Sequence, residues 1–111
     1  MKLYGIKNCS QVKKAKDCLI LNKEDYQEID VRKDGLAKEI VKHWIDCRSL
    51  EEVLNKRSKV FKDLDLGSKV VDETMFLDLI EKHPLLFKRP LLVKGDKVFV
   101  GLKEIEAIYS N

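Results

Sequence analysis

The sequence predicts an α/β fold in which a βαβ unit and a ββα unit share one mixed four-stranded sheet, with an all-helical insertion between them. Three observations lead to this fold class. The chain opens with a short apolar run, a helical pattern and a second strand-like run. Residues 36–83 carry only helical patterns, and the chain closes with two strand-like runs and a last helical pattern.

The opening residues predict a strand, a helix and a second strand. Residues 2–6 are typical of a short buried strand, and residues 11–21 repeat apolar side chains at helical spacing. The residues expected on the buried helix face are Val12, Ala15, Cys18 and Leu19. Residues 26–31 alternate with the period of a strand. We expect two parallel neighbouring strands joined by a right-handed crossover.

The middle of the chain is expected to be helical. After the segment RKDG interrupts the strand pattern, apolar residues return at helical spacing. The first stripe consists of Leu36, Ile40, Val41, Trp44 and Ile45. Ser49 and Glu52 have the spacing of a capping box, and Asp72 is a candidate N-cap. Residues 64–69 are expected to form a loop.

The last third of the chain returns to β structure after Pro84. Residues 91–94 and 97–100 are expected to form a hairpin around Gly95–Asp96, and residues 102–109 a final helix. This order of elements is the thioredoxin-like arrangement, with helices inserted in the middle.

Length and composition suit one such domain. The chain has 111 residues, 44% of them hydrophobic, which is enough for one modest core. Five Gly and two Pro argue against disorder. We expect residues 1–111 to form a single thioredoxin-like domain with the helical insertion at about residues 36–83.

Charge and hydropathy limit the partners of the chain. The net charge is +3 and no long run of one sign is present, so nucleic-acid binding is not expected, whereas a small anionic substrate is compatible. No apolar stretch approaches the ~20 residues that cross a membrane, and the opening apolar run is too short for a signal peptide. We expect a soluble, cytoplasmic protein that does not contact membranes.

The three cysteines are too few and too widely spaced for a disulfide scaffold. A zinc site is not expected either, because the chain has two His and no C-x-x-C pattern. Cys9 lies where the first strand ends and the first helix begins, a position at which helix N–H groups favour an anion and hence a reactive thiolate. The alternative is that Cys9 is only a small apolar residue at a strand end. For Cys18 and Cys47 we favour structural roles.

Cys9 has no second cysteine close behind it. The third residue after it is Val12, and Cys18 lies roughly 13 Å along the helix, beyond the reach of a disulfide. A thiol that releases Cys9 from a mixed disulfide would therefore come from outside, for example from glutathione or a redoxin. Cys47 remains an internal candidate.

Five stretches resemble one protein family in the right order. The stretch YGIKNCSQVKKA at residues 4–15 is similar to the signature Y-G-I-x-N-C-D-T-x-K-K-A. The other four are VRKDGL, LNKRSKVFKDL, HPLLFKRPLLV and VFVGLKE. Together they resemble the arsenate reductase (ArsC)/Spx-like proteins of the thioredoxin superfamily, and above all the small YffB-type branch of that family.

The resemblance implies roles for particular residues. Cys9 is the redox-active thiol, and Arg57 and Arg89 match the two arginines that face it and bind an anionic group. Pro90 matches a cis-proline that exposes the backbone beside the cysteine to an extended thiol. The other candidate substrate-binding residues are Asn8, Ser10 and Lys13.

Each of these assignments has a simpler alternative. The two arginines can be solvated surface charges, and Pro90 can be an ordinary trans proline at a strand start. Capping of the helix would by itself explain Ser10.

The resemblance implies a thiol-dependent reductase with glutathione or glutaredoxin as partner and no bound cofactor. A first alternative is arsenate reduction with glutathione and glutaredoxin. Against it, Lys13 replaces an arginine of the C-G-T-S-R motif, and Lys103 stands where a third arginine is expected. A second alternative is an Spx-like regulator that binds the RNA polymerase α subunit, although the second cysteine of those regulators is missing.

Overall fold

The computed structural model describes residues 1–110, which form two compact units. The sheet unit comprises Met1–Asp34 and the described residues from Arg89 onward, and the helical unit comprises Gly35–Lys88. The expectation that the whole chain is one domain with an insertion at about residues 36–83 stays a prediction.

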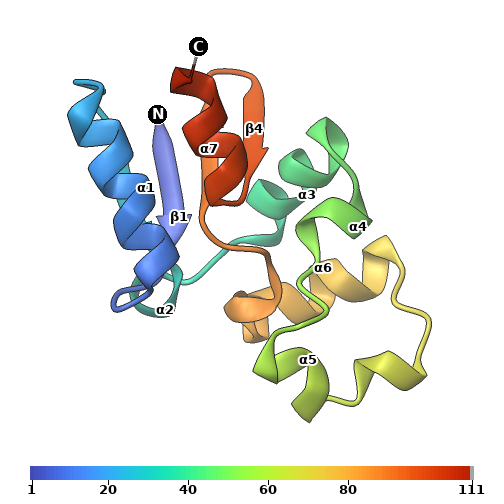
Figure 1. The fold of residues 1–111 in the computed structure, drawn as a ribbon. Coiled ribbons are helices and arrows are strands. Elements are labelled where there is room, and N and C mark those ends of the chain that lie inside the picture. The colour runs from blue at the N-terminus through green and yellow to red at the C-terminus, as the bar shows by residue number, and fades with distance from the viewer. Residues whose placement is uncertain (111) are drawn as a thin grey trace. The chain divides into compact units, whose positions relative to one another are not determined.

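The sheet unit contains one mixed four-stranded sheet, in the order β2-β1-β3-β4 (Figure 1). Its elements are β1 (Lys2–Gly5), α1 (Ser10–Leu21), β2 (Gln27–Asp30), α2 (Val31–Asp34), β3 (Leu91–Lys94), β4 (Lys97–Val100) and α7 (Leu102–Tyr109). Strand β1 runs parallel to β2 and antiparallel to β3, and β4 is antiparallel to β3. The predicted βαβ and ββα units on one sheet are therefore confirmed.

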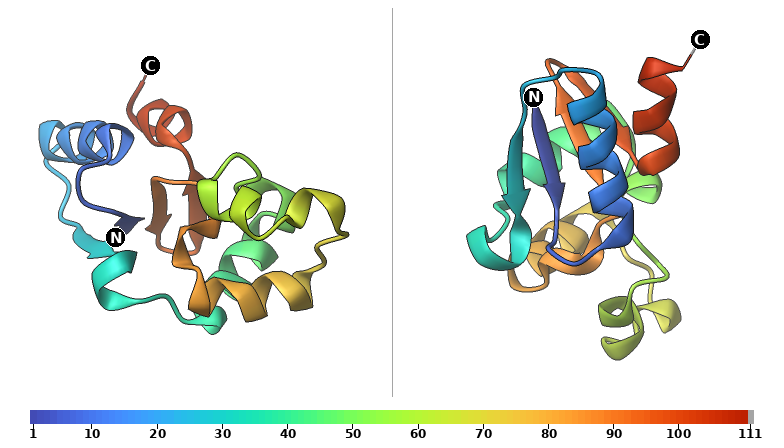
Figure 2. Two further views of the ribbon diagram at one scale, coloured as in Figure 1. Left: turned by 90° about the horizontal axis from the view of Figure 1, so that it is seen from below. Right: turned by 60° about the vertical axis from the view of Figure 1, so that its left-hand side comes forward.

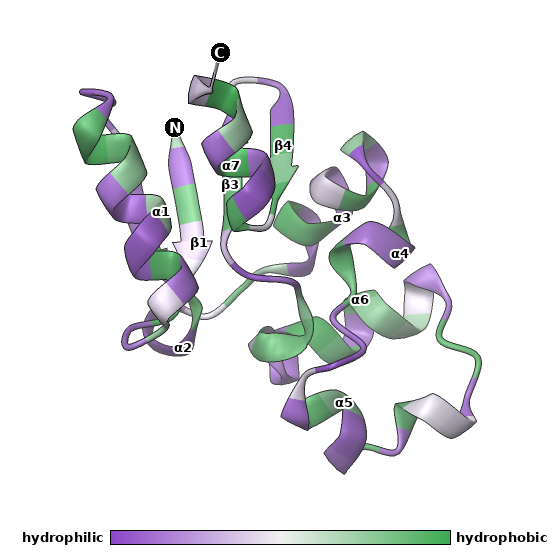
Figure 3. Ribbon diagram, in the orientation of Figure 1, coloured by the Kyte–Doolittle hydropathy of each residue, from purple (hydrophilic) through white to green (hydrophobic). Residues whose placement is uncertain are grey.

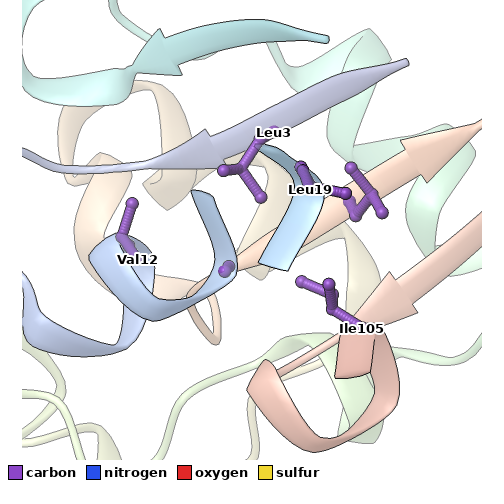
Figure 4. Packing of buried hydrophobic residues seen from close by; sticks show 6 residues of the cluster. Leu3, Val12, Leu19 and Ile105 are labelled. Carbon is purple, nitrogen blue, oxygen red and sulfur yellow. The ribbon is translucent and has the colours of Figure 1, made fainter. Parts of the chain in front are cut away.

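A hydrophobic core joins the sheet to α1 and α7, which lie side by side along it (Figure 2). The buried side chains of this core are Leu3, Val12, Ala15, Leu19, Leu92 and Ile105. Leu3, Leu19 and Ile105 point toward one another from β1, α1 and α7 (Figure 4). Burial of each large side chain contributes about 1.5–3 kcal/mol, so this cluster holds α1 firmly against the sheet.

The helical unit is built from short helices, and α4, α5 and α6 among them begin with a side-chain cap. Its elements are α3 (Lys38–Cys47), α4 (Leu50–Val53), α5 (Lys59–Asp63), η1 (Leu66–Ser68), α6 (Glu73–Lys82) and η2 (Pro84–Leu86). The Ser49 Oγ accepts a hydrogen bond from Glu52 N at 3.1 Å, and Asp72 Oδ1 accepts one from Met75 N at 2.9 Å, which confirms both predicted caps. The Trp44 and Phe87 rings, 5.2 Å apart between centroids, pack inside the unit.

Three local expectations were wrong. The second strand ends at Asp30, because the Asp30 carboxylate accepts a hydrogen bond from Arg32 N at 3.0 Å and turns the chain into α2. Ile40 is 38% exposed, because it lies at the edge of the apolar stripe of α3. Residues 64–69 are not an open loop but contain η1, in which the Ser68 hydroxyl bonds back to Asp65.

Within the part of the chain that the structure describes, no helix has both the length and the apolar character needed to cross a membrane.

Candidate active site

Cys9 occupies the junction between β1 and α1. It is the N-cap residue of α1, its carbonyl accepts a hydrogen bond from Lys13 N at 3.0 Å, and its side chain is half-buried against the core. The Cys9 side chain makes no capping hydrogen bond to the first turn. Ser10 is the first helical residue rather than the cap, so the capping explanation of Ser10 is wrong. The Cys9 thiol thus lies at the positive end of a 12-residue helix.

Asn8 determines how the chain reaches Cys9. Its φ angle of 64° lies in the left-handed region, which asparagine tolerates better than most residues. This conformation reverses the chain direction between β1 and α1. Asn8 therefore has a backbone role that is independent of any contact with substrate.

Strand β2 lies on one side of β1, and the segment that carries Arg89 lies on the other side, before β3. Tyr4 of β1 pairs with Leu91 of β3, and Arg89 lies two residues before that pair. Burial lowers the pKa of the half-buried Arg89 guanidinium, the charge of Cys9 raises it, and the charge of Arg32 lowers it again. Both the Cys9 side chain and the Arg32 side chain therefore act electrostatically on the Arg89 guanidinium.

The Arg89–Pro90 peptide bond is cis, as the resemblance implied. Pro90 is buried, and its carbonyl accepts a hydrogen bond from Gly101 N at 2.8 Å. This bond attaches the segment before β3 to the start of α7.

A pocket of about 790 Å³ opens beside the thiol. The predicted site residues that line it are Asn8, Cys9, Ser10 and Lys13. It extends along α1 toward Tyr26 and Glu28 near β2. Two ion pairs lie on this wall, Lys13 with Asp17 and Lys16 with Glu28, each at 3.0 Å. Because Ile6, Val12 and Ile20 also line the pocket, it presents both apolar and charged surface, and it is large enough for a small thiol compound.

Arg57 belongs to the helical unit, whereas the other predicted site residues belong to the sheet unit. It is exposed, and its backbone N–H donates to Asn55 Oδ1 at 3.1 Å, just before the cap of α5. That Arg57 faces Cys9 stays a prediction.

The other two cysteines have different surroundings. Burial raises the pKa of the half-buried Cys18 thiol, Glu106 raises it further, and a contact with Asn22 Nδ2 at 3.8 Å opposes the rise. Cys47 is exposed at the end of α3, with its Sγ 3.6 Å from His43 Nε2. None of the three cysteines forms a disulfide bond with another within residues 1–110. Cys18 is thus half-buried, whereas the helical pattern placed it on the buried face with Val12, Ala15 and Leu19; that its thiol is unreactive stays a prediction.

The sequence interpretation gave Arg32 no role at the site, because it took RKDG as an interruption between elements and VRKDGL only as a stretch that resembles the family. The predicted parallel pairing of the first two strands could have indicated that Arg32 lies near the site. Parallel neighbours end at the same edge of a sheet, so residues that follow the second strand lie near those that follow the first. Both α2 and the turn after β1 are largely hydrophilic (Figure 3).

Comparison with known proteins shows one family over nearly the whole chain. Residues 4–108 match the model of the ArsC family. An uncharacterised protein of Haemophilus influenzae is 33% identical over 94% of this chain and 92% of its own length. The global transcriptional regulator Spx 2 of Bacillus anthracis is 27% identical over 94% of this chain and 81% of its own length.

Solved structures show the same likeness. A YFFB protein is 34% identical, with a TM-score of 0.83, covering 90% of this chain and 89% of that chain. A possible arsenate reductase from Streptococcus mutans UA159 is 28% identical, with a TM-score of 0.79, covering 90% of this chain and 88% of that chain.

Proposed function

Because the chain belongs to the ArsC family, we propose that it is a thiol-dependent reductase whose nucleophile is the Cys9 thiolate and whose co-substrate is glutathione. One observation carries the proposal. The Cys9 sulfur lies at the N-terminus of a long helix, near the Arg89 guanidinium, and borders an open pocket. A helix N-terminus and a neighbouring cation both favour the thiolate, which is the reactive form.

The proposed reaction is a pair of thiol–disulfide exchanges. The Cys9 thiolate attacks the glutathione sulfur of a mixed disulfide, so that a Cys9–glutathione disulfide forms and the substrate leaves as a thiolate, which takes a proton from water. The thiolate of a second glutathione attacks the glutathione sulfur of that intermediate. This step releases glutathione disulfide and restores the Cys9 thiolate. One mixed disulfide and one glutathione thus become one thiol and one glutathione disulfide.

The other site residues would bind the anionic ends of the substrate. Arg89, and Arg57 if it faces the thiol, would form paired hydrogen bonds with a carboxylate or another oxyanion. Lys13 would attract the same charge from the first turn of α1, while Asn8 and Ser10 would donate or accept hydrogen bonds at the mouth of the pocket. Pro90 would present the adjoining backbone to the bound thiol.

The releasing thiol of this proposal is external, because Cys18 is too far along α1 to reach Cys9; Cys47 stays an internal candidate. It lies nine residues along α1 from Cys9, is half-buried and has a raised pKa. Glutathione fits the role of the external thiol. A reaction that consumes glutathione belongs in a reducing compartment, so we place the protein in the cytoplasm.

Turnover of a glutathionylated peptide with glutathione tests the proposal. Cys9→Ser should abolish turnover, since no thiolate remains to form the intermediate. Cys18→Ser is the matched control, because it removes a thiol from the same helix and should leave turnover unchanged. Activity that survives in Cys9→Ser would disprove the proposal.

Two alternatives rest on the named relatives. The likeness to a possible arsenate reductase supports arsenate reduction, and an assay with arsenate, glutathione and glutaredoxin decides it. The likeness to Spx 2 supports a regulator that binds the RNA polymerase α subunit, and a pull-down with the purified subunit decides that. Both rank below the thiol-dependent reductase. This chain lacks the third arginine expected of an arsenate reductase, and it lacks the second cysteine expected of an Spx-like regulator.

A further inference from the structure

We propose that Arg32 binds, together with Arg89, the anionic group of the substrate beside Cys9. This inference rests on the proposed function, because it names a further binding residue of the same site. It also narrows the substrate class to compounds that carry an oxyanion, such as a carboxylate, next to the reacting sulfur.

The topology of the sheet unit places the two arginines on either side of the turn that leads from the end of β1 to Cys9. Strand β1 lies between β2 and β3, with Gly5 opposite Asp30 and Tyr4 opposite Leu91. The chain leaves β1 toward Cys9, and it leaves β2 at the same edge toward α2 (Figures 1 and 2). Arg32 follows the end of β2 by two residues, and Arg89 precedes β3 by two.

The Asp30 carboxylate links the backbone of Arg32 to the turn between β1 and Cys9. Its Oδ1 accepts a hydrogen bond from Arg32 N at 3.0 Å, and its Oδ2 accepts one from Lys7 N at 3.4 Å. One side chain thus holds both the start of α2 and the start of the turn that leads to Cys9. The backbone of Arg32 is fixed relative to that turn, while its side chain remains exposed.

The charges also point to a bound anion. The Arg32 charge lowers the pKa of Arg89 and the Cys9 charge raises it, so both groups act on the Arg89 guanidinium. Two guanidinium groups repel each other, and an oxyanion between them relieves the repulsion while accepting hydrogen bonds from both. Among residues 1–110, no ion pair of the structure involves Arg32, so its guanidinium is available to a ligand.

Alkylation of Cys9 in the full chain tests the inference without any need for turnover. Iodoacetate and iodoacetamide both transfer a carbon to the thiolate and release iodide, but only iodoacetate carries a carboxylate. The rate of each reaction is followed at low salt from the mass of the Cys9 peptide. The ratio of the two rates reports how strongly the site attracts an anion, and it cancels changes in the reactivity of the thiol itself.

Arg32→Gln should lower the iodoacetate-to-iodoacetamide ratio about threefold, the effect of one charge several ångströms away in a solvated site. Lys33→Gln removes an equal charge from the next position of α2 and should leave the ratio nearly unchanged. Arg32→Lys should restore most of the ratio, which excludes misfolding as the cause. An unchanged ratio in Arg32→Gln, or an equal fall in Lys33→Gln, would overturn the inference.

Steady-state kinetics then separates this inference from the proposed function. With a glutathionylated peptide, Arg32→Gln should raise KM severalfold and leave kcat nearly unchanged, because the contact binds substrate before and during the reaction. With a neutral disulfide substrate the same variant should behave like wild type. Equal losses on both substrates would contradict anion binding by Arg32. Turnover that persists in Cys9→Ser would instead disprove the reductase, whatever the alkylation ratio.

Discussion

Gly5 and Val12 pack so closely that a side chain on Gly5 would not fit. A Cβ atom added to Gly5 would lie 2.6 Å from Val12 Cγ2 and 3.0 Å from Val12 Cγ1. Gly5 is the last residue of β1, and Val12 faces the core from the first turn of α1. This contact therefore sets the distance between strand and helix at the point where the chain passes through Cys9.

Gly5→Ala should push α1 away from β1. We expect it to lower the free energy of unfolding by about 1–3 kcal/mol, the usual effect of overpacking, and to change the alkylation rate of Cys9. Urea unfolding measures the first effect. Gly67→Ala is the control, because the nearest atom to its added Cβ, Phe61 Cε1, is 3.9 Å away. Val12→Ala should partly rescue Gly5→Ala; additive losses would show that the two residues do not conflict.

Asn8 should be replaceable by glycine but not by valine. The left-handed φ of 64° costs a β-branched residue at least about 1–2 kcal/mol, whereas glycine adopts it freely. We expect Asn8→Val to unfold at lower urea concentration and Asn8→Gly to remain close to wild type. If Asn8→Gly keeps its stability but loses turnover, the amide also contacts substrate. Equal stability of the two variants would contradict the backbone role.

The N-cap of α6 should contribute about 1 kcal/mol to the free energy of unfolding. Asp72→Ala removes the acceptor of the Met75 N–H bond, leaving that helix donor without its cap. Asp78→Ala, in the middle of the same helix, removes an equal charge without removing a cap and should change the stability by less than about 0.5 kcal/mol. Thermal unfolding compares the two. Matching losses would indicate a general charge effect in place of capping.

Tyr109 should stabilise the fold most at pH values between the ordinary pKa of Glu24, 4.5, and its own ordinary pKa, 10.0. Its hydroxyl donates to Glu24 Oε2 at 2.6 Å, and Lys94 Nζ lies 3.3 Å from the same oxygen. The Tyr109 bond, and then Lys94, lower the pKa of Glu24, whereas burial and the Glu24 contact raise the pKa of Tyr109. These two shifts act on stability at opposite ends of the pH range.

A lowered carboxyl pKa contributes stability above the ordinary value of 4.5, and this contribution is lost as the pH falls through the folded value. A raised phenol pKa contributes stability below the ordinary value of 10.0, and this contribution is lost as the pH rises beyond it. The stability advantage of wild type over Tyr109→Phe should therefore be greatest between these limits and shrink on both sides. Urea midpoints across pH measure it, with Tyr26→Phe as control. A difference independent of pH would contradict the linkage.

Much of the sheet unit could be predicted because its signals are local. The strands 91–94 and 97–100 and the helix 102–109 lie where the hairpin and helical patterns placed them. The candidate nucleophile followed from the same local reasoning, since a strand and a helix met at Cys9. The cis bond before Pro90 followed from the family likeness, because proline geometry alone permits both isomers.

Two of the features that prediction missed, Ile40 and Arg32, depend on neighbours distant in sequence, whereas the end of β2 depends on a local hydrogen bond. Ile40 has the spacing of a core residue, and only the packing around α3 leaves it exposed. The end of β2 depends on the Asp30 carboxylate, which local alternation does not reveal. Arg32 looked like part of a loop, because its relation to Arg89 requires the register of β1 with β2 and β3.

The sequence by itself determined the family, the order of strands and helices, and the position of Cys9 at a helix start, because periodicity and short motifs are local properties of the chain. Only the tertiary structure decided that Arg89 interacts with both Cys9 and Arg32. Strand pairing brings together residues 9, 32 and 89 across large sequence separations, and no spacing along the chain encodes the distance between them.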